Sequence, residues 1–364
     1  MAELYIDGLS APQEIKVALA SLSKTYSFTK EVEKGANGYL FFGRNRIMGT
    51  EVAVKFYYWG GEKEYHAEPR NLAAIKCDNI LSILDASFID NDWAYFVTPH
   101  CPNGDLDDYI EKTRFGNLQA IDLVSSVLNG LSHLHSERFL HRDIKPSNIY
   151  LDSNNQAVIG DFGSLKVAPE GKDSVPSSSH SILYRPPESV LQNTYSCKGD
   201  IYQMGVVFYQ LLGGALPYDE YAWMSKAELK HFNDLADQVD RSIYVDQCIK
   251  NRITKGKVVN LNSLPPWVSS QVKRVIRKAV HLDPSKRYKN ATEFKADLHK
   301  IRPTTLDWSI SEGHPHLSAT TSYRIIRNGD NFSVQKRKTG DWRNDNTISG
   351  GSLKELVQEI EAKA

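Results

Sequence analysis

Two short polar segments constrain this chain more than any other feature, because together they supply an acid–base group and metal ligands. The first is the run HRDIKPSN at residues 141–148, and the second is DFG at residues 161–163. Asp143 can accept a proton from a hydroxyl group, while Asn148 and Asp161 offer the oxygen ligands that Mg²⁺ prefers. Both runs, in this order and at this distance, indicate a catalytic site that uses a metal ion.

The hydrophobic pattern changes from strand-like to helical near Gly104. The segments before that point are strand-like over residues 26–57, 80–88 and 93–98, with one helical segment over residues 62–75. The segments after it show helical spacing of apolar residues over 121–134, 201–212 and 268–282. The pattern predicts an α+β fold with a β-rich first lobe and a helical second lobe.

Further motifs surround the two polar segments. The run VAVK lies at residues 52–55, RPPE at residues 185–188 and DPSKR at residues 283–287. With this set of motifs, residues 26–302 resemble the Hanks-type serine/threonine protein kinase family. The resemblance implies a bilobal kinase fold, ATP and Mg²⁺ as cofactors and a protein as substrate.

The resemblance also implies roles for the catalytic residues. Asp143 would take the proton of the substrate hydroxyl, and Lys145 would neutralise the transferred phosphoryl group. Asn148 and Asp161 would bind Mg²⁺. Lys145 is typical of serine/threonine kinases, and Ser181 occupies the place of a threonine that bonds the catalytic aspartate in them. We therefore expect transfer to serine or threonine.

On the phosphate side, the resemblance covers part of a glycine-rich loop and the strand after it. The residues assigned to nucleotide binding here are Gly35, Gly38, Leu40, Ala53 and Lys55. The first glycine of the family pattern is replaced by Glu33. Glu68 is the helix carboxylate expected to hold Lys55, although Pro69 follows it directly and Glu62 and Glu64 are competitors.

Residues 98–106 resemble the hinge that joins the two kinase lobes. The cofactor-binding residues assigned here are Thr98, Pro99, Cys101, Asp105 and Tyr150. Thr98 would be the gatekeeper, and the backbone of Pro99 and Cys101 would meet the adenine edge. Asp105 would bond a ribose hydroxyl, cap the helix that follows, or do both. Tyr150 stands where the family usually has an aliphatic residue under the adenine, so an unusually shaped pocket is expected.

Three residues of the second lobe are expected to be structural. Glu188 of the RPPE run should form a buried ion pair with Arg287, and Asp200 should anchor the backbone of the catalytic segment. Arg142 is typical of kinases whose activation segment is ordered by a phosphate. The serines available for such a phosphate are Ser174, Ser177, Ser178 and Ser179. Our hypothesis is autophosphorylation there, and the alternative is an unmodified loop.

The two ends of the chain lie outside the kinase-like region. Residues 1–25 form an N-terminal extension with a short helix expected to pack on the next domain, and residues 303–321 look like a linker. Residues 322–364 predict a small module with a β-hairpin and a helix that begins with the capping pattern of Ser352 and Glu355. The hairpin is basic and carries Trp342, but the acidic helix offsets its charge. Docking of a protein is therefore favoured, and nucleic acid is an unlikely partner.

Composition limits the remaining possibilities. Lys and Arg number 44, as do Asp and Glu, so the formal net charge is zero and broad binding to nucleic acid or membrane is disfavoured. Four scattered cysteines suit reduced thiols, and we see neither a membrane-spanning run nor a signal pattern. We expect a cytoplasmic protein.

The expected activity is transfer of the γ-phosphate of Mg-ATP to a serine or threonine of a protein. One alternative is a pseudokinase scaffold that binds nucleotide without transfer, favoured by the missing first glycine, Pro69 and Tyr150. Another is a small-molecule phosphotransferase of related fold. Such enzymes commonly lack both the Phe-Gly after the metal-binding aspartate and the Pro-Glu segment found here.

Overall fold

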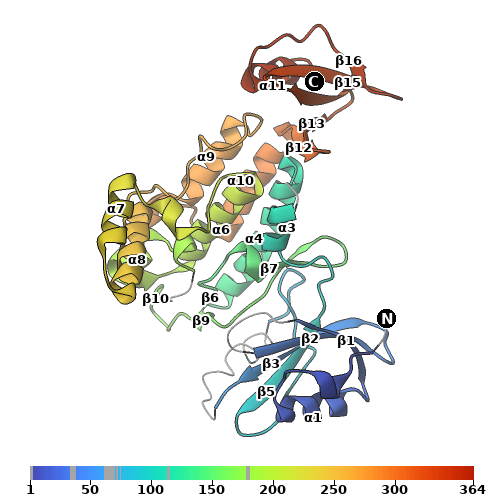
Figure 1. Cartoon of the computed structure of the whole chain (residues 1–364), viewed down its shortest axis with the longest axis vertical. Helices are drawn as coiled ribbons and strands as arrows, with labels where there is room; N and C mark the ends of the chain where they lie inside the picture. The colour runs from blue at the N-terminus through green and yellow to red at the C-terminus, as the bar shows by residue number, and fades with distance from the viewer. Residues whose placement is uncertain are drawn as a thin grey trace. The chain divides into compact units, whose positions relative to one another are not determined.

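The computed structural model describes residues 3–32, 38–60, 70, 73, 75–112, 115–177 and 181–364. The chain divides into two compact units, each described here by itself. The first contains Met1–Asp105 and Asn148–Leu165, and the second contains Leu106–Ser147 and Lys166–Ala364. The first is built on β-strands and the second mainly on helices (Figure 1), which confirms the predicted α+β fold class.

The first unit is organised around an antiparallel five-stranded sheet in the order β1-β2-β3-β5-β4. The strands are β1 (Tyr26–Val32), β2 (Gly38–Asn45), β3 (Glu51–Tyr58), β4 (Asp85–Phe88) and β5 (Trp93–Pro99). Along β3, Val52, Val54 and Phe56 are buried on one face, because successive side chains of a strand point to opposite faces. Of the strand expected over residues 80–88 only β4 forms, and Ile80 instead makes a single bridge to Ile159.

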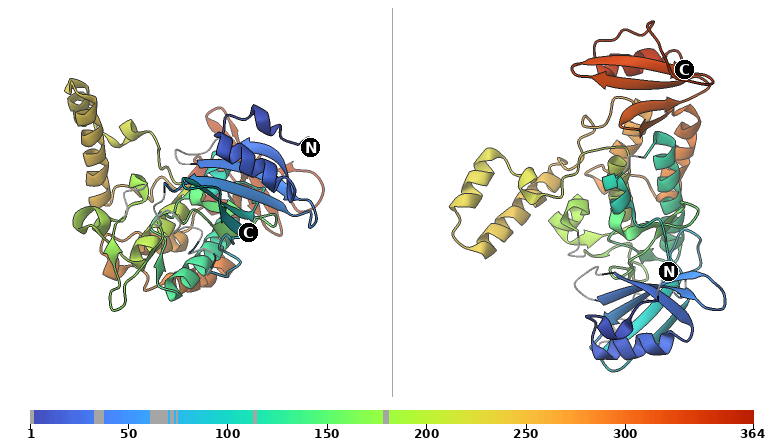
Figure 2. Two further views of the ribbon diagram at one scale, coloured as in Figure 1. Left: turned by 90° about the horizontal axis from the view of Figure 1, so that it is seen from below. Right: turned by 45° about the vertical axis from the view of Figure 1, so that its right-hand side comes forward.

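The N-terminal extension belongs to the core of this sheet. Helix α1 (Gln13–Leu22) follows the short turn η1 (Ile6–Gly8) and lies on one face of the sheet (Figure 2). Its Ile15 and Leu19 are fully buried in one cluster with Phe28, Phe41 and Val54. This confirms that the extension packs on the domain that follows it. Lys55 lies on the opposite face of β3, away from this cluster.

A second, smaller hairpin completes the first unit. Strands β7 (Ile149–Leu151) and β8 (Ala157–Ile159) pair antiparallel after the turn η3 (Pro146–Asn148). The amide of Leu151 donates to the carbonyl of Gly104 at 2.9 Å, and that of Leu81 donates to Ile159 at 2.8 Å. The hairpin is therefore bound to the segments on either side of β4 and β5.

The second unit packs around a helix that is buried on all sides. Helix α6 (Cys197–Leu211) has every residue from Gly199 to Leu211 buried, as expected for a helix in the middle of a large core. A Cβ at Gly205 would lie 2.7 Å from Val280 and 2.8 Å from Ala279, so glycine allows α9 (Ser270–Ala279) to approach α6 closely. The helices of this unit, apart from the C-terminal module, are α3 (Leu106–Lys112), α4 (Asn117–Ser136), α5 (Pro187–Gln192), α6 (Cys197–Leu211), α7 (Lys226–Asp234), α8 (Gln238–Thr254), α9 (Ser270–Ala279) and α10 (Ala291–Ile301).

Short strands and turns hold the segments between these helices. The strand pairs are β6 (Phe139–Leu140) with β9 (Lys166–Val167), and β10 (Val175–Pro176) with β11 (Thr194–Tyr195). The short turns are η4 (Ile182–Tyr184), η5 (Glu220–Trp223), η6 (Pro284–Lys286) and η7 (Arg302–Thr304). Helices α7 and α8 lie side by side (Figure 2). Among the described residues, every helix is too short or too polar to cross a membrane.

The C-terminal module is larger than the sequence pattern indicates. Five antiparallel strands, β12 (Asp307–Ser311), β13 (His314–Ser318), β14 (Ser322–Asn328), β15 (Asn331–Arg337) and β16 (Arg343–Asn344), form one sheet. The assignment of residues 303–321 to a linker is therefore wrong, because β12 and β13 occupy most of this segment. The two strands meet at Glu312 and Gly313, which have φ angles of +51° and +77° and form a tight hairpin turn.

The predicted parts of the module are present. Strands β14 and β15 pair through Asn328 and Asn331, around the expected turn. Helix α11 (Leu353–Glu361) begins with a capping box in which Ser352 accepts from the amide of Glu355 and Glu355 accepts from the amide of Ser352. These elements confirm the hairpin-plus-helix prediction.

The module is joined tightly to the helical core. The side-chain amide of Asn117 donates to the carbonyls of Trp267 and Leu306, at 3.2 and 3.0 Å. The fully buried Trp308 ring stacks on Trp267 with centroids 5.9 Å apart, and its Nε1 donates to Glu361 at 3.0 Å. Strand β12 thus links the helical core to the last helix.

Trp308→Ala is expected to lower the free energy of unfolding by about 3–5 kcal/mol, because it removes a large buried ring and its hydrogen bond. Trp342→Ala is the control, since that ring is only half-buried in the same module, and about 1 kcal/mol is expected. Urea denaturation followed by circular dichroism measures both. Equal losses in the two variants would contradict the anchoring role of Trp308.

Candidate active site

The catalytic segment is anchored by the buried carboxylate of Asp200. Its Oδ2 accepts from the amide of His141 at 3.1 Å, and its Oδ1 accepts from the amide of Arg142 at 2.9 Å. The ring of His135 and the hydroxyl of Tyr195 also contact it, at 2.7 and 2.8 Å. Asp200 thus holds the backbone directly before Asp143, as expected from the sequence.

Gln203, one turn further along α6, holds the backbone on the other side. Its Oε1 accepts from the amide of Ile144 at 2.9 Å, and its Nε2 donates to the carbonyl of Arg142 at 3.3 Å. The hydroxyl of Tyr195 also donates to Gln203 Oε1 at 2.8 Å. Two neighbouring polar side chains of a buried helix therefore fix the peptide units around Asp143.

The charge of Asp200 survives burial because it is surrounded by donors. Burial alone would raise the pKa of this carboxyl, but the hydrogen bond from His135 and the nearby imidazole rings hold it below 3.8. The amide of Arg142 acts in the same direction. The anchor is therefore ionised at neutral pH.

The predicted catalytic residues of the second unit meet at Lys145. Its Nζ lies 2.9 Å from Asp143 Oδ2 and donates to Ser181 Oγ at 2.8 Å. Asp143 is 5% exposed, so its carboxylate is held next to a fixed positive charge. The structure brings these three predicted residues together, with Lys145 between the other two.

The expected pair of Glu188 and Arg287 is present and buried. The two terminal guanidinium nitrogens of Arg287, Nη1 and Nη2, each lie 2.7 Å from one oxygen of Glu188. The remaining donors of Arg287 reach the carbonyls of His281, Lys198 and Leu282. Every N–H donor of Arg287 thus has a partner, which reduces the desolvation penalty of burying its charge. The pair can therefore fix the RPPE segment in the core.

The activation segment is partly ordered against the catalytic segment. Arg142 donates to the carbonyl of Pro176 at 2.8 Å, and β10 pairs with β11. Ser174 is exposed, while the hydroxyl of Ser177 donates to Asn193 Oδ1 at 2.5 Å. Ser178 and Ser179 lie outside the described residues.

The two predicted Mg²⁺ ligands flank the β7–β8 hairpin of the first unit. Asn148 directly precedes β7, and Asp161 comes two residues after β8. The amide of Gly160 donates to the carbonyl of Asn148 at 2.9 Å, which brings the two positions together. Their amide and carboxylate oxygens are hard donors that suit Mg²⁺. The residues present therefore fit the ion that the sequence motifs imply.

Lys55 lies in the middle of the five-stranded sheet. It pairs with Leu40 on β2 and Phe96 on β5, and its Nζ lies 5.5 Å from the centre of the Phe96 ring. At Gly38 an added Cβ would collide with the carbonyl oxygen of Phe56, so this position requires glycine. Gly35 and Glu68 lie outside the described residues.

The hinge-like segment follows β5. Thr98 is buried and pairs with Ala53, and Pro99 pairs with Val52 at the end of β5. The amide of Gly104 donates to the carbonyl of Cys101 at 3.1 Å, which makes a turn. Burial raises the pKa of the Cys101 thiol to about 11, so it is protonated at neutral pH.

Asp105 and Tyr150 meet in an isolated bridge between the hinge and β7. Asp105 is buried, and its backbone leads directly into α3. The Tyr150 ring lies over Gly160, where an added Cβ would be 2.6 Å from Cε2 and 2.9 Å from Cδ2. The absence of a side chain at Gly160 therefore makes room for the unusual tyrosine.

Comparison with known proteins identifies the family. The protein kinase domain family matches residues 26–298, which are 273 of the 364 residues. The chain belongs to the protein kinase family. This membership confirms the Hanks-type assignment made from the motifs.

Curated relatives include serine/threonine kinases from bacteria and an Aurora kinase from a yeast. Serine/threonine-protein kinase PrkC of Bacillus subtilis is 26% identical over 290 residues, 76% of this chain and 40% of that protein. Aurora kinase of Yarrowia lipolytica is 26% identical over 293 residues, 77% of this chain and 70% of that protein. Probable serine/threonine-protein kinase PknB of Lactococcus lactis is 25% identical over 291 residues, 78% of this chain and 42% of that protein. The chain thus spans less than half the length of the two bacterial relatives.

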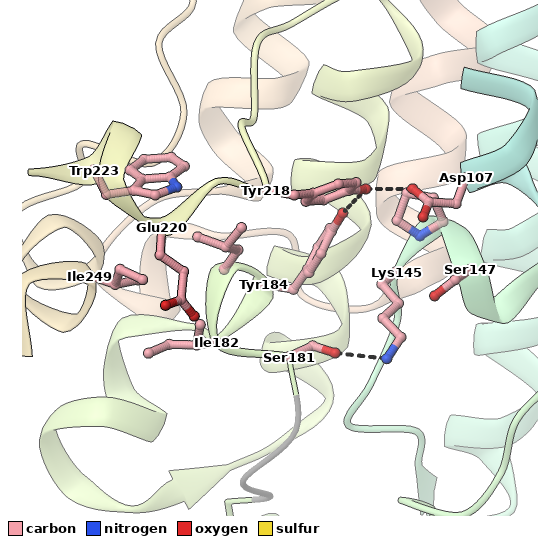
Figure 3. A pocket seen from close by; sticks show the side chains of 12 residues that line it. Asp107, Lys145, Ser147, Ser181, Ile182, Tyr184, Tyr218, Glu220, Trp223 and Ile249 are labelled. Carbon is pink, nitrogen blue, oxygen red and sulfur yellow. Dashed lines mark hydrogen bonds between the residues drawn. The ribbon is translucent and has the colours of Figure 1, made fainter. Parts of the chain in front are cut away.

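One feature of this kinase's second unit was not expected from the sequence. A pocket of about 340 Å³ begins at Lys145 and Ser181 and extends to Tyr218, Glu220, Trp223 and Ile249 (Figure 3). Tyr218 closes one side, because its hydroxyl donates to Asp107 at 2.5 Å. The lining residues come from separate parts of the chain, so the pocket follows from the fold and not from any sequence spacing.

Asp200→Asn is expected to lower the free energy of unfolding at pH 7 by about 3 kcal/mol, because it removes a buried charge that four donors surround. The folded pKa of Asp200 lies below 3.8, so its stabilisation is complete above the unfolded value and is lost as the pH falls through the folded value. The difference in the free energy of unfolding between the native chain and Asp200→Asn should therefore become smaller below about pH 4. Urea denaturation over a pH series measures this difference. A difference that does not change with pH would contradict its assignment to the charge of Asp200.

Gly160→Ala is expected to destabilise the kinase by about 1–3 kcal/mol, because the new methyl group collides with the Tyr150 ring. Adding Tyr150→Leu should recover most of that loss, which a double-mutant cycle by urea denaturation detects. Gly163→Ala serves as the control, since its Cβ would meet only Asp161 Oδ1, at 3.4 Å. Additive effects of the first two substitutions would refute the steric coupling.

Proposed function

We propose that this chain is an active serine/threonine protein kinase that transfers the γ-phosphate of Mg-ATP to a protein hydroxyl. The observation that carries the proposal is the contact of Lys145 with both Asp143 and Ser181. Phosphoryl transfer needs a positioned hydroxyl and positive charge near the transferred group, and these side chains supply both.

Each residue has a distinct role in this proposal. The buried carboxylate of Asp143 orients the substrate hydroxyl and accepts its proton. Lys145 carries positive charge to the phosphoryl group, and Lys55 does the same for the other phosphates. Asn148 and Asp161 hold Mg²⁺, which when bound neutralises charge on the phosphate oxygens.

The pseudokinase scaffold is the competing function. It is favoured by Glu33 in place of the first glycine and by Tyr150 in the adenine-binding position. Against it, the fit of Gly160 to the Tyr150 ring indicates a pocket adapted to tyrosine rather than a degraded one. Lys55, Asp143, Asn148 and Asp161 are all retained, which favours catalysis.

The proposal includes a cytoplasmic location, a protein substrate and docking of a protein at the C-terminal module. The guanidinium groups of Arg324 and Arg337 lie 4.7 and 4.5 Å from the Trp342 ring, on the sheet of that module. Such a basic, aromatic surface suits an acidic segment of a protein partner.

Incubation with labelled γ-phosphate of ATP and Mg²⁺ should label a serine/threonine protein substrate such as a basic test protein. Asp143→Asn should slow transfer by about 10²–10⁴-fold, because the hydroxyl loses its proton acceptor, and Asp161→Ala should do so by removing a metal ligand. Asp330→Asn, in the β14–β15 turn, is the control and should leave the rate unchanged. Nucleotide binding without transfer by the native chain would favour the scaffold.

The same incubation should add phosphate to at least one serine of the segment from Ser174 to Ser179, by autophosphorylation of the chain. A phosphate there would lie in the segment whose Pro176 carbonyl already contacts Arg142, so the guanidinium is a natural partner. Intact-mass analysis followed by peptide mapping tests this. Transfer to a substrate with no phosphate in this segment would reject the loop hypothesis alone.

A further inference from the structure

The pocket beside Lys145 and Ser181 has one rigid aromatic and aliphatic wall. Trp223 donates through Nε1 to the carbonyl of Pro217 at 2.9 Å, and its own carbonyl accepts from Arg252 Nε at 3.0 Å. Arg252 also contacts Glu228, which ties η5 to α7 and α8. Trp223 and Ile249 therefore present a fixed apolar surface to the pocket.

A second rigid element is the floor formed by Tyr184. Its hydroxyl donates to Gln210 at 2.9 Å and lies 3.1 Å from the hydroxyl of Tyr218. Tyr218 in turn donates to Asp107, so four side chains from separate elements form one network. A pocket with such fixed walls can select a side chain without first being ordered.

The charges around the pocket are predominantly negative. Asp107 and Glu220 are its carboxylates, and Lys145 is the cation among its lining residues. The charge of Lys145 is engaged by Asp143 at 2.9 Å. Figure 3 shows the carboxylate of Glu220 turned toward Ile182, on the side of the pocket opposite Asp107 and Lys145. Within the described part of the chain Glu220 has no ion-pair partner, so its negative charge faces an apolar wall.

We propose that this pocket binds an arginine or lysine side chain of the protein substrate, close to the residue that is phosphorylated. The assignment rests on the kinase activity proposed above. The aliphatic stem of the side chain lies against Ile182, Ile249 and Trp223, and its positive head reaches Glu220. The Trp223 ring adds a cation–π contact.

Other side chains fit these surroundings less well. A purely apolar side chain would cover the wall but leave the Glu220 carboxylate partly desolvated and unpaired. An acidic side chain would be repelled by Glu220 and Asp107. A basic side chain can both pack its aliphatic stem on the apolar wall and pair its charge with the Glu220 carboxylate.

The test uses serine peptides in which one residue near the serine is arginine, leucine or glutamate, moved through each neighbouring position. At one position arginine should raise kcat/KM at least roughly fivefold over leucine with the native chain. Glu220→Gln should remove most of this preference, and Glu220→Lys should turn it toward glutamate at the same position. Asp234→Asn, which removes an exposed carboxylate of α7 outside the pocket, is the matched control and should keep the native preference.

Reversal of the preference in Glu220→Lys would establish the charge contact, since loss of folding cannot create a new specificity. Equal use of the three peptides by the native chain, or an arginine preference that Glu220→Gln and Glu220→Lys leave intact, would overturn the pocket assignment while the kinase activity stands. Failure to phosphorylate any peptide or the chain itself would instead overturn the kinase function, and this assignment with it.

Discussion

The catalytic half of the chain depends on one buried carboxylate. Burying an unpaired charge costs several kcal/mol, so Asp200 is tolerated only because four donors surround it. Two of those donors are backbone amides of the catalytic segment. The hydrogen bonds that stabilise the charge of Asp200 are therefore the same ones that position Asp143. Helix α6 can carry this group because it is buried on all sides and cannot shift. The same helix supplies Gln203 to the segment and Gln210 to the hydroxyl of Tyr184, which lines the pocket beside Lys145, so one buried helix supports both.

The sequence predicted the features that depend on local patterns or on paired motifs. Strand alternation located β1, β2, β3 and β5, and helical spacing located α4, α6 and α9. The capping pattern at Ser352 identified the start of α11, since a cap is decided by a few adjacent residues. The Glu188–Arg287 pair was predictable because both residues belong to recognisable motifs.

The features that were missed depend on tertiary packing. Residues 303–321 contain Pro315, Gly313 and several small polar residues, a composition typical of linkers, yet they form two strands. Trp308 and Leu317 face the core of the module and stabilise those strands, while each strand alone is only five residues long.

The pocket beside Lys145 was missed for a similar reason. Tyr218, Glu220 and Ile249 come from separate elements, and no sequence spacing relates them to Ser181.

Tyr150 shows how a departure from a family pattern gains meaning from structure. In the sequence it stood as an argument for lost function, because a bulky ring replaces an aliphatic residue. In the first unit its ring occupies the space that a side chain at Gly160 would need, directly before Asp161, the predicted metal ligand. The glycine leaves room for the ring without a steric clash, so the tyrosine is accommodated by its surroundings.

Three residues of the candidate site have a left-handed backbone conformation. Arg142, Asp161 and Ser181 have φ angles of +69°, +55° and +39°, which residues other than glycine rarely adopt. Each such conformation costs about 1–3 kcal/mol and persists only where the surroundings enforce it. At Arg142 the enforcing contacts are visible, because Asp200 accepts from its amide and Gln203 donates to its carbonyl. Relaxing this peptide would release strain but would turn away the amide that Asp200 holds. The buried carboxylate therefore maintains a conformation that the local sequence alone would not adopt.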